Sequence, residues 1–593
     1  MLAYPAMTSR ASFVFSFACV LVASSALAES SPNYSGMTFE KNVAIPMRDG
    51  VVLRGDVIRP QGAGPFAVLV YRTPYNKEDA LQEYATFQHA VERGYAVVAV
   101  DVRGRYASDG DVRPYETEGR DGYDTIEWAA KQSWSNGAVG TFGLSYPGAV
   151  QWLAAVENPP HLKAMVPAMT FSTYQNFFYA GGTFDMSWID WLWGNIAWDV
   201  RVKKNLPGPH NYEEAAAEWK KHGDEMHSKL PLNSMDAFRE LTPSYYGWLA
   251  HPVDDPWWDW CELRNKYFKT SAAVLNLSAW YDDNYGPEGA ATNFNGLVHS
   301  RGGKPDRTAL LMGPWVHGEM AVAKAGERAF PSLAAIDYDE VVLRWLDHYV
   351  RGINNGVDRA RPVRYYVMGA DEWRDADSWP PVARRTPYFL QPGTDGNFGL
   401  LVPNTRPAKP GSTAFASDPA DPVKNVYETS GAHDYRELSK RSDVLTFETA
   451  ALDRDTEITG PIEADMFMSC DSKDADLYVR LLDVAPDGTA FNLMSPGLDV
   501  QRASYRQIAK GRQLLTPDTV YELHLTNLMT SNVFKSGHRI RIQISGSFFP
   551  NFSRNLQTGE LETVSGKTQK ATIRIYHERA HPSRMILPVI AHN

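Results

Sequence analysis

The sequence predicts a large α/β domain that is interrupted by a helical cap and followed by an all-β domain. Three patterns in the 593 residues carry this prediction. Strand-like and helix-like segments alternate over residues 38–165 and again over 266–355, whereas the segment 166–265 between them is aromatic and mostly helical. Over residues 360–593 the chain reads as short strands separated by turn residues, with almost no helical periodicity.

The α/β part contains continuous apolar runs, which are typical of strands that are buried on both faces. Phe66–Tyr71 and Gly94–Asp101 are two such runs, and Tyr123–Lys131 beyond them has the spacing of an amphipathic helix. The pattern returns at Ala272–Ser278 and at Thr308–Gly313. Alternation of this kind predicts a parallel sheet with helices on both faces.

The segment between these two halves is rich in tryptophan. Nine of the 17 tryptophans lie between Trp188 and Trp260, and helical stretches such as Tyr212–His222 interrupt the aromatic clusters. A plain connection does not need this density, so we expect a helical cap here. Later strands such as Val363–Met368 recur between Gly, Pro, Asp and Asn, which predicts a sandwich or jelly roll at the C-terminal end.

The first 28 residues have the layout of a secretory signal peptide. Arg10 is followed by the apolar run Ala11–Val22, and small residues stand at Ala26 and Ala28 before the expected cut. The apolar run is too short for an ordinary membrane span, and no later segment has 18 consecutive apolar residues. We therefore expect a secreted or periplasmic protein without a stable membrane span.

Charge and cysteine content exclude several classes of function. The formal net charge of −11 argues against nucleic acid as the main partner. After the expected cut two cysteines remain, Cys261 and Cys470, and we expect buried free thiols rather than a disulfide. The sequence has no zinc-protease, phosphate-loop, calcium-loop or dinucleotide motif, so no metal or organic cofactor is implied. No pattern in it defines an oligomeric state.

The strongest local motif is Gly143-x-Ser145-x-x-Gly148, which lies between an apolar strand and a helix. A nucleophilic serine on a sharp strand-to-helix turn needs glycines nearby, because the backbones approach closely there. The second glycine stands one position later than in the common G-x-S-x-G pattern. One interpretation is a structural turn without a catalytic role. The other is a nucleophilic Ser145, which the strand–turn–helix context supports.

A nucleophilic serine requires a base and an acid that orients the base. In α/β-hydrolases the chain order is Ser, then Asp or Glu, then His, with the last two on loops after later strands. Asp282 follows one later strand, and His317 follows the next, 35 residues further on. This order predicts a triad of Ser145, Asp282 and His317. Asp283 is a rival acid, and the alternative for His317 is a surface or capping histidine.

Longer motifs accompany these three residues along the chain. They are Arg72-Thr-Pro-Tyr75-Asn-Lys77, Asp101-Val-Arg-Gly-Arg-Tyr-Ala-Ser-Asp-Gly110, Gly143-Leu-Ser-Tyr-Pro-Gly148, Trp280-Tyr-Asp282, Gly313-Pro-Trp-Val-His317, Asp474-Ala-Asp-Leu-Tyr-Val-Arg480, Gly537-His-Arg-Ile-Arg-Ile-Gln-Ile-Ser545 and Phe549-Pro-Asn-Phe-Ser-Arg-Asn555. This combination resembles the cocaine esterase-type (CocE/NonD) serine hydrolases, which belong with the X-Pro dipeptidyl-peptidase group. The resemblance covers about residues 38–580, and the later glycine of the turn is itself the family's form.

The resemblance implies a fold and an activity. The fold is an α/β hydrolase over 38–165 and 266–355, with a helical cap insertion over 166–265 and a C-terminal all-β jelly-roll domain over 360–593. The activity is hydrolysis of an ester, or of an amide, through the triad and an acyl-enzyme.

The resemblance also implies an oxyanion hole. One donor is the backbone N–H of the residue after the nucleophile, here Tyr146. The other is the hydroxyl of the tyrosine in the Pro-Tyr motif, here Tyr75. From the residues alone, a core tyrosine after a strand would be the preferred interpretation of Tyr75.

The substrate is less clearly marked. One branch of the family, the α-amino acid ester hydrolases, holds a substrate ammonium with carboxylates two and three positions after the triad aspartate. Those positions hold Asn284 and Tyr285 here, so that cluster is not visible. We expect instead a neutral or aromatic acyl group that packs among Phe184, Trp188 and Trp191; the alternative is that these aromatics form the core of the cap.

Two alternative functions stay open. An amide acylase or α-amino acid ester hydrolase of β-lactam-type substrates would use the same triad. A non-catalytic carbohydrate-binding protein on a hydrolase scaffold is a different class, since jelly rolls often bind carbohydrate. The apparent triad together with Tyr75 argues against a pure binding role. We therefore expect a serine hydrolase that acts on a small-molecule ester or amide.

Overall fold

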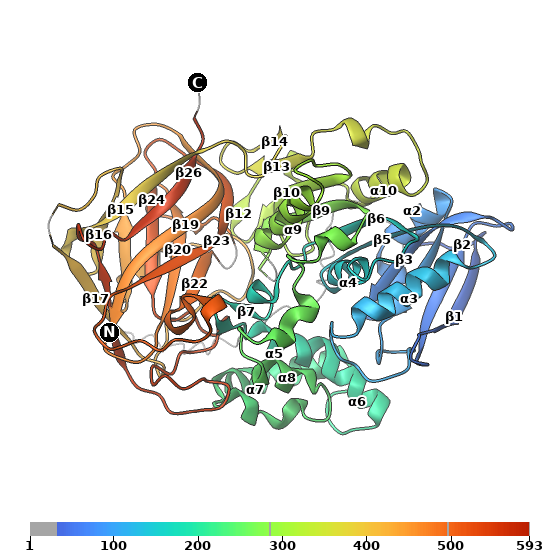
Figure 1. Ribbon diagram of the computed structural model, residues 1–593, viewed down its shortest axis with the longest axis horizontal. Coiled ribbons are helices and arrows are strands. Elements are labelled where there is room, and N and C mark those ends of the chain that lie inside the picture. The colour runs from blue at the N-terminus through green and yellow to red at the C-terminus, as the bar shows by residue number, and fades with distance from the viewer. Residues whose placement is uncertain (1–31, 284–285, 409, 495–496, 592–593) are drawn as a thin grey trace, which may run out of the picture.

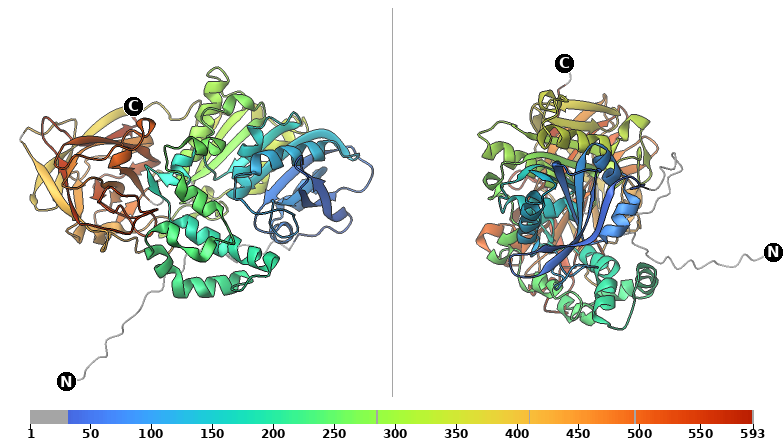
Figure 2. Two further views of the ribbon diagram at one scale, coloured as in Figure 1. Left: turned by 60° about the horizontal axis from the view of Figure 1, so that its bottom comes forward. Right: turned by 90° about the vertical axis from the view of Figure 1, so that its right-hand side faces the viewer.

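The computed structural model describes residues 32–591 with gaps at 284–285, 409 and 495–496 (Figure 1). It consists of an α/β domain, a mostly helical cap and a C-terminal β domain, and Figure 2 shows the cap beside both other parts. The signal peptide expected at residues 1–28 lies outside the described residues, as do Asn284 and Tyr285.

The α/β domain is built on a ten-stranded sheet with the order β1-β2-β4-β3-β5-β6-β9-β10-β13-β14. From β4 to β13 in this order the strands run parallel, whereas β1, β2 and β14 are antiparallel to their neighbours. The strands are β1 (Thr38–Pro46), β2 (Val52–Arg59), β3 (Phe66–Thr73), β4 (Tyr95–Asp101), β5 (Ser135–Leu144), β6 (Leu162–Ala168), β9 (Ala273–Tyr281), β10 (Thr308–Val316), β13 (Val363–Val367) and β14 (Glu372–Ala376).

Helices cover both faces of this sheet. They are α1 (Lys77–Glu83), α2 (Thr86–Glu92), α3 (Glu118–Ala130), α4 (Tyr146–Ala155), α9 (Gly286–Ser300) and α10 (Tyr338–Tyr349). On β3, Val68 and Val70 belong to the core beneath α3 and α4, whereas Leu69 and Tyr71 belong to the core beneath α2 and α10. Because side chains alternate along a strand, burial of both faces produces the continuous apolar run seen in the sequence.

The cap is inserted between β6 and β9 and is held together by aromatic side chains. Phe178 contacts the rings of Trp188, Trp248 and Trp258, with centroid separations of 4.9, 4.7 and 4.9 Å. This shared core accounts for the density of tryptophan, because large aromatic side chains bury much apolar area. Its main elements are β7 (Tyr179–Ala180), β8 (Thr183–Phe184), α5 (Ser187–Trp191), the π-helical turn η2 (Leu192–Ala197), α6 (Trp198–Lys204), α7 (Tyr212–Ser228) and α8 (Ser244–Ala250).

The C-terminal domain is all-β, and its described residues form twelve strands, β15 to β26. Cys470 is buried in it as a free thiol, and Cys261 is buried in the cap in the same state, as expected. The strands are β15 (Arg384–Asp395), β16 (Phe398–Pro403), β17 (Ser412–Ser417), β18 (Val444–Glu448), β19 (Thr456–Cys470), β20 (Asp476–Val484), β21 (Ala490–Asn492), β22 (Leu498–Arg502), β23 (Tyr521–Phe534), β24 (Arg539–Ser545), β25 (Ala571–Tyr576) and β26 (Arg584–Val589).

One stretch that the sequence assigns to the C-terminal domain belongs to the α/β sheet. Val363–Met368 was expected as a jelly-roll strand, yet β13 pairs in parallel with β10, and β14 pairs with β13. A short apolar strand between turn residues fits either sheet, so the sequence pattern does not separate the two. The first strand of the twelve-stranded domain begins at Arg384.

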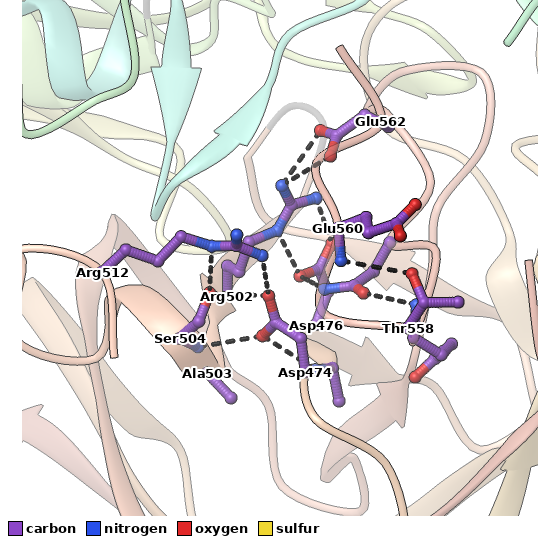
Figure 3. A network of polar contacts seen from close by, with 12 residues as sticks. Asp474, Asp476, Arg502, Ala503, Ser504, Arg512, Thr558, Glu560 and Glu562 are labelled. Atoms are coloured by element: carbon purple, nitrogen blue, oxygen red, sulfur yellow. Dashed lines mark hydrogen bonds and ion pairs between the residues drawn. The ribbon is translucent and has the colours of Figure 1, made fainter. Parts of the chain in front are cut away.

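A buried charge network joins the C-terminal domain to the cap (Figure 3). The Arg502 guanidinium donates to both carboxylate oxygens of Asp476 and to Glu562, and all three side chains are buried. The backbone N–H of Arg502 donates to the carbonyl of Gly181, and the Thr183 hydroxyl donates to Asp476. The β7–β8 hairpin of the cap is therefore fixed to the C-terminal domain. Among the described residues, no helix has the length and apolarity that crossing a bilayer requires.

Candidate active site

The turn between β5 and α4 has the geometry of a nucleophile elbow. Ser145 lies at its tip with φ 68° and ψ −127°, a conformation that non-glycine residues rarely adopt. Gly143 also has a positive φ, 140°, and a Cβ there would lie 2.5 Å from Cβ of Pro147. A Cβ at Gly148 would lie 2.6 Å from the carbonyl oxygen of Ala168 in β6. The close approach of α4 to β6 therefore requires the later glycine.

Asp282 and His317 follow neighbouring parallel strands. β9 ends at Tyr281 and β10 ends at Val316, and these two residues are partners in the ladder, so the next residues lie side by side. His317 Nδ1 and Asp282 Oδ1 are 2.9 Å apart. Because a carboxylate only accepts hydrogen bonds, Nδ1 carries the hydrogen, and Nε2 is the basic nitrogen of the neutral ring.

Burial and charge act in opposite directions on His317. Burial lowers its pKa, but the charge of Asp282, the hydrogen bond to Asp282 and the charge of Asp283 outweigh burial and raise the pKa above its ordinary value of 6.5. Asp282 is fully buried, whereas the His317 side chain keeps 18% of its surface exposed. The buried carboxylate of Asp282 therefore stabilises the protonated ring of His317, and the ring remains partly accessible. A general base requires both properties.

Asp283, the rival acid, contacts the C-terminal domain. Its side chain is exposed and accepts a hydrogen bond from the hydroxyl of Ser430, which lies between β17 and β18. The structure thus brings Asp282, rather than Asp283, to the ring nitrogen of His317. The Asp283–Ser430 contact also brings the C-terminal domain to the edge of the site.

Ser145 lies at the same edge of the sheet as the His–Asp pair. β5, β9 and β10 run parallel in one sheet, and each of the three residues directly follows the carboxyl end of its strand. The loop after β10 reaches the elbow, since a Cβ at Gly318 would lie 4.0 Å from the side chain of Leu144. Open α/β sheets bind their ligands at this edge.

A buried network holds the side chain of Tyr146 beneath the elbow. Its hydroxyl donates to Glu118 Oε1 at 2.7 Å and accepts from the backbone N–H of Tyr115 at 2.9 Å, and Glu118 is ion-paired with Arg72. Its ring stacks on Trp191 with an interplanar angle of 10° and a centroid separation of 5.8 Å. The backbone N–H of Tyr146 belongs to the first turn of α4, where N–H groups have no partner within the helix.

Tyr75 lies across the same aromatic group, on the turn after β3. Its ring meets those of Tyr146 and Trp191 edge-to-face, with centroid separations of 6.4 and 6.5 Å. The indole N–H of Trp191 donates to the Tyr75 hydroxyl oxygen at 3.0 Å. A phenol that accepts at its oxygen directs its own hydrogen toward another acceptor, so Trp191 orients the Tyr75 hydroxyl.

The three residues predicted to line an acyl pocket are buried in the cap. Phe184 has no exposed surface, and Trp188 is 6% exposed with its indole N–H donated to the carbonyl of Phe177. These two side chains therefore fit the alternative that they form the core of the cap. Trp191 is also buried, but it borders the site through its contact with Tyr75.

Arg105, which ties the turn after β3 to the cap, and Glu118, which holds Tyr146, were not singled out from the sequence. Arg105 lies within the Asp101–Gly110 motif, so the motif itself was the available indication. Glu118 begins an ordinary amphipathic helix, and its contact with Tyr146 spans 28 residues. Within the described residues, no group of three or more His, Cys, Asp or Glu side chains could hold a metal ion.

An elbow serine at the same edge of a parallel sheet as a His–Asp pair is the architecture of the serine hydrolases of the α/β class, and known proteins agree with it. Residues 49–319 match the X-Pro dipeptidyl-peptidase (S15) family, and residues 355–586 match the C-terminal non-catalytic domain of X-Pro dipeptidyl-peptidases. The cocaine esterase of Rhodococcus sp. (strain MB1 Bresler) is 32% identical over 94% of this chain and 99% of its own. The chain therefore belongs to the family of cocaine esterase-type (CocE/NonD) serine hydrolases.

Two solved structures share the fold along nearly the whole chain. An aminopeptidase from a marine sediment archaeon (Thaumarchaeota archaeon) has a TM-score of 0.81 and 23% identity, covering 96% of this chain and 99% of that one. An α-amino acid ester hydrolase has a TM-score of 0.76 and 24% identity, covering 96% and 100%. These structures confirm the predicted α/β-hydrolase fold with its C-terminal β domain. The family match and the cocaine esterase relative confirm the prediction of a serine hydrolase.

Proposed function

We propose that this protein hydrolyses carboxylic esters through Ser145, His317 and Asp282. The observation that supports this best is the 2.9 Å contact between His317 Nδ1 and Asp282 Oδ1, at the sheet edge that carries Ser145. His317 Nε2 takes the hydroxyl proton of Ser145 while Oγ attacks the acyl carbonyl. The proton then passes to the leaving alcohol, and an acyl-enzyme remains. Water, deprotonated by His317, releases the acid and restores Ser145.

Negative charge develops on the carbonyl oxygen in both steps. We assign its two donors to the backbone N–H of Tyr146 and the hydroxyl of Tyr75, because fixed donors shielded from water stabilise such charge strongly. The hydrogen bond from Trp191 supports this role, since it directs the Tyr75 hydrogen away from the indole.

The acyl group is neutral or aromatic in this proposal. Tyr75, Tyr146 and Trp191 form an aromatic cluster beside the elbow, in which Tyr75 is only partly buried. Flat apolar groups pack against such surfaces with little loss of entropy, and a few polar donors then fix their orientation.

The deciding experiment is active-site labelling with a fluorophosphonate, beside a panel of short-chain, long-chain and aromatic nitrophenyl esters and one anilide. The protein is expected to label and to hydrolyse the esters, whereas Ser145→Ala does neither. Labelling that persists in Ser145→Ala would refute the assigned nucleophile. A protein that neither labels nor hydrolyses would lead instead to the carbohydrate-binding alternative, and a glycan screen would follow.

A second candidate, hydrolysis of α-amino acyl esters or amides, is favoured by one observation. Burial raises the pKa of Asp185 in the cap to about 7, and the charges of Asp190 and Asp283 add to the rise. Asp283 also acts on His317, so a second carboxyl group lies within electrostatic reach of the site. A substrate ammonium would favour the charged form of both carboxyl groups.

The two candidates are separated by one pair of substrates. Phenylalanine nitrophenyl ester and its N-acetyl counterpart differ only in the ammonium group. A preference for the free amine that weakens in Asp185→Asn would support the second candidate. A preference for the acetylated ester supports the neutral acyl group.

The proposed location is the periplasm or the extracellular medium. It rests on the layout of residues 1–28, with small residues at Ala26 and Ala28. N-terminal sequencing of the exported protein is expected to begin at Glu29. An unprocessed N-terminus on protein recovered from the cytoplasm would contradict the proposal.

A further inference from the structure

Arg105 is a fully buried arginine that joins the turn after β3 to the cap. Its Nε donates to the carbonyl of Pro74 at 2.9 Å. Its Nη1 donates to the carbonyl of Ile196 at 2.7 Å, and its Nη2 donates to that of Asn195 at 2.6 Å. One planar group therefore ties the residue before Tyr75 to the π-helical turn of the cap.

The two cap carbonyls belong to the turn that directly follows Trp191. α5, the π-helical turn and α6 run on without a break, so the turn sets the direction in which Trp191 points. A π turn holds one extra residue, which directs its carbonyls differently from those of a regular helix. The side-chain amide of Asn195 also donates to the carbonyl of Trp191 at 3.2 Å. By fixing this turn, Arg105 thus also restricts the position of Trp191.

The turn that carries Tyr75 is also held from its other side. The buried Lys77 Nζ lies 3.5 Å from Asp56 and 3.3 Å from Asp101, and the Lys77 backbone N–H donates to Asp101 at 2.8 Å. Because Pro74 and Lys77 are both fixed, the backbone of Tyr75 between them has little freedom. The position of the Tyr75 hydroxyl then depends on the groups around its ring.

The charge of Arg105 is balanced at the cap. Asp199 of α6 lies 3.4 Å from Nη1 and also accepts from the backbone N–H of Tyr106 at 3.2 Å. A lysine would supply the same charge as a single point, whereas the guanidinium fork reaches three carbonyls in fixed directions. The contacts are therefore specific to arginine.

We propose that Arg105 is a positioning residue for the oxyanion hole. By tying Pro74 to the π-helical turn, it sets the separation between Tyr75 and Trp191 and hence the direction of the Tyr75 hydroxyl. The inference rests on the proposed role of Tyr75 as a donor to the oxyanion. Arg105 acts through Tyr75 rather than on the substrate.

The test is a double-mutant cycle measured with a nitrophenyl ester. Arg105→Lys is expected to lower kcat about 10- to 100-fold with little change in KM, less than the roughly 100- to 1,000-fold that loss of a whole oxyanion donor costs. Tyr75→Phe removes that donor. In the Tyr75→Phe background, Arg105→Lys is expected to change kcat by less than about threefold, because the hydroxyl that transmits its effect is gone.

Arg103→Lys is the matched control. Arg103 belongs to the same segment, and its ion-pair partners are Asp121 in α3 and Asp49 before β2, away from the cap. This change is expected to leave kcat within about twofold, equally in both backgrounds, since distant effects add.

Each outcome decides a different point. Equal losses from Arg105→Lys in both backgrounds would overturn the positioning role while leaving Tyr75 as a donor. An unchanged kcat in Tyr75→Phe would refute the proposed oxyanion hole, and the positioning role with it. If Arg105→Lys does not fold, Asp199→Asn is the second variant. It removes the charge that faces Arg105 Nη1 but keeps the size and shape of the side chain at position 199. It is expected to cause a smaller loss of kcat that also disappears in the Tyr75→Phe background; a loss that persists there overturns the proposal.

Discussion

Asp282 and Asp283 are adjacent in the chain and have opposite surroundings. Asp282 is fully buried and bonded to His317, whereas Asp283 is exposed and bonded to Ser430 of another domain. β9 ends at Tyr281, and Asp283 already belongs to the turn that follows it. One carboxylate can therefore orient the ring while the other adds only its charge.

This difference predicts the pH dependence of catalysis. The base acts as neutral imidazole, so a raised pKa of His317 moves the acid limb of kcat/KM above pH 6.5. Asp282→Asn removes the interactions that raise this pKa, so the acid limb is expected to move to lower pH while the plateau falls by about 10,000-fold. A pH profile of ester hydrolysis measures both changes.

Asp283→Asn is the control for that profile. Its charge raises the pKa of His317 from a distance, so the variant is expected to shift the acid limb downward slightly and to keep most of the plateau. A larger loss from Asp283→Asn than from Asp282→Asn would exchange the roles of the two carboxylates.

At the scale of elements, the elbow depends on how closely α4 lies against β6. Gly148 stands where a Cβ would be 2.6 Å from the carbonyl of Ala168. The same helix begins at Tyr146, whose backbone N–H is a proposed oxyanion donor, so any shift of α4 moves that donor. Gly148 therefore affects both the packing of α4 and the position of the proposed oxyanion donor.

Gly148→Ala is expected to lose both stability and activity. The methyl group forces α4 away from β6, at a cost of about 1–3 kcal/mol, and displaces the N–H of Tyr146. Gly247→Ala in α8 is the matched control, because a Cβ there meets its nearest atom only at 3.8 Å. Thermal unfolding and labelling rates measure both. A Gly148→Ala variant as stable and active as Gly247→Ala would contradict this account of the elbow.

The sequence predicts the elements that carry local patterns and misses contacts between distant segments. Ser145, Asp282 and His317 each follow an apolar strand, so their common edge could be inferred from strand order alone. The contact of Trp191 with Tyr75 spans 116 residues and has no periodicity to indicate it. The strand β13 was expected in the C-terminal β domain, yet it pairs with β10 of the α/β sheet, because a short strand does not identify its partner.

At the scale of the whole molecule, the C-terminal domain fixes the cap. Arg502 pairs with Asp476 and Glu562 in a buried network (Figure 3). Arg502 also holds the backbone of Gly181, and Asp476 holds the side chain of Thr183. Buried charges of this kind depend on one another, since removal of one leaves the others unpaired.

Arg502→Met is therefore expected to destabilise the protein strongly, by about 3–5 kcal/mol, because two buried carboxylates lose their partner. Arg361→Met is the matched control at an exposed pair with Asp377, where solvent screens the charges and the melting temperature is expected to change little. Unfolding monitored by circular dichroism and by residual ester hydrolysis compares them. Equal melting temperatures for the two variants would show that the network does not hold the domains together.

The cap hairpin has a further consequence for the newly made chain. Thr183 bonds to Asp476, 293 residues later, and Phe184 bonds to Ser553, 369 residues later. A chain still on the ribosome already contains the elbow and the His–Asp pair, but its hairpin has nothing to dock on, and contacts over such distances form late. Trp191 follows that hairpin within a few residues. The hairpin that precedes Trp191 can thus gain these contacts only after Ser553 has been synthesised.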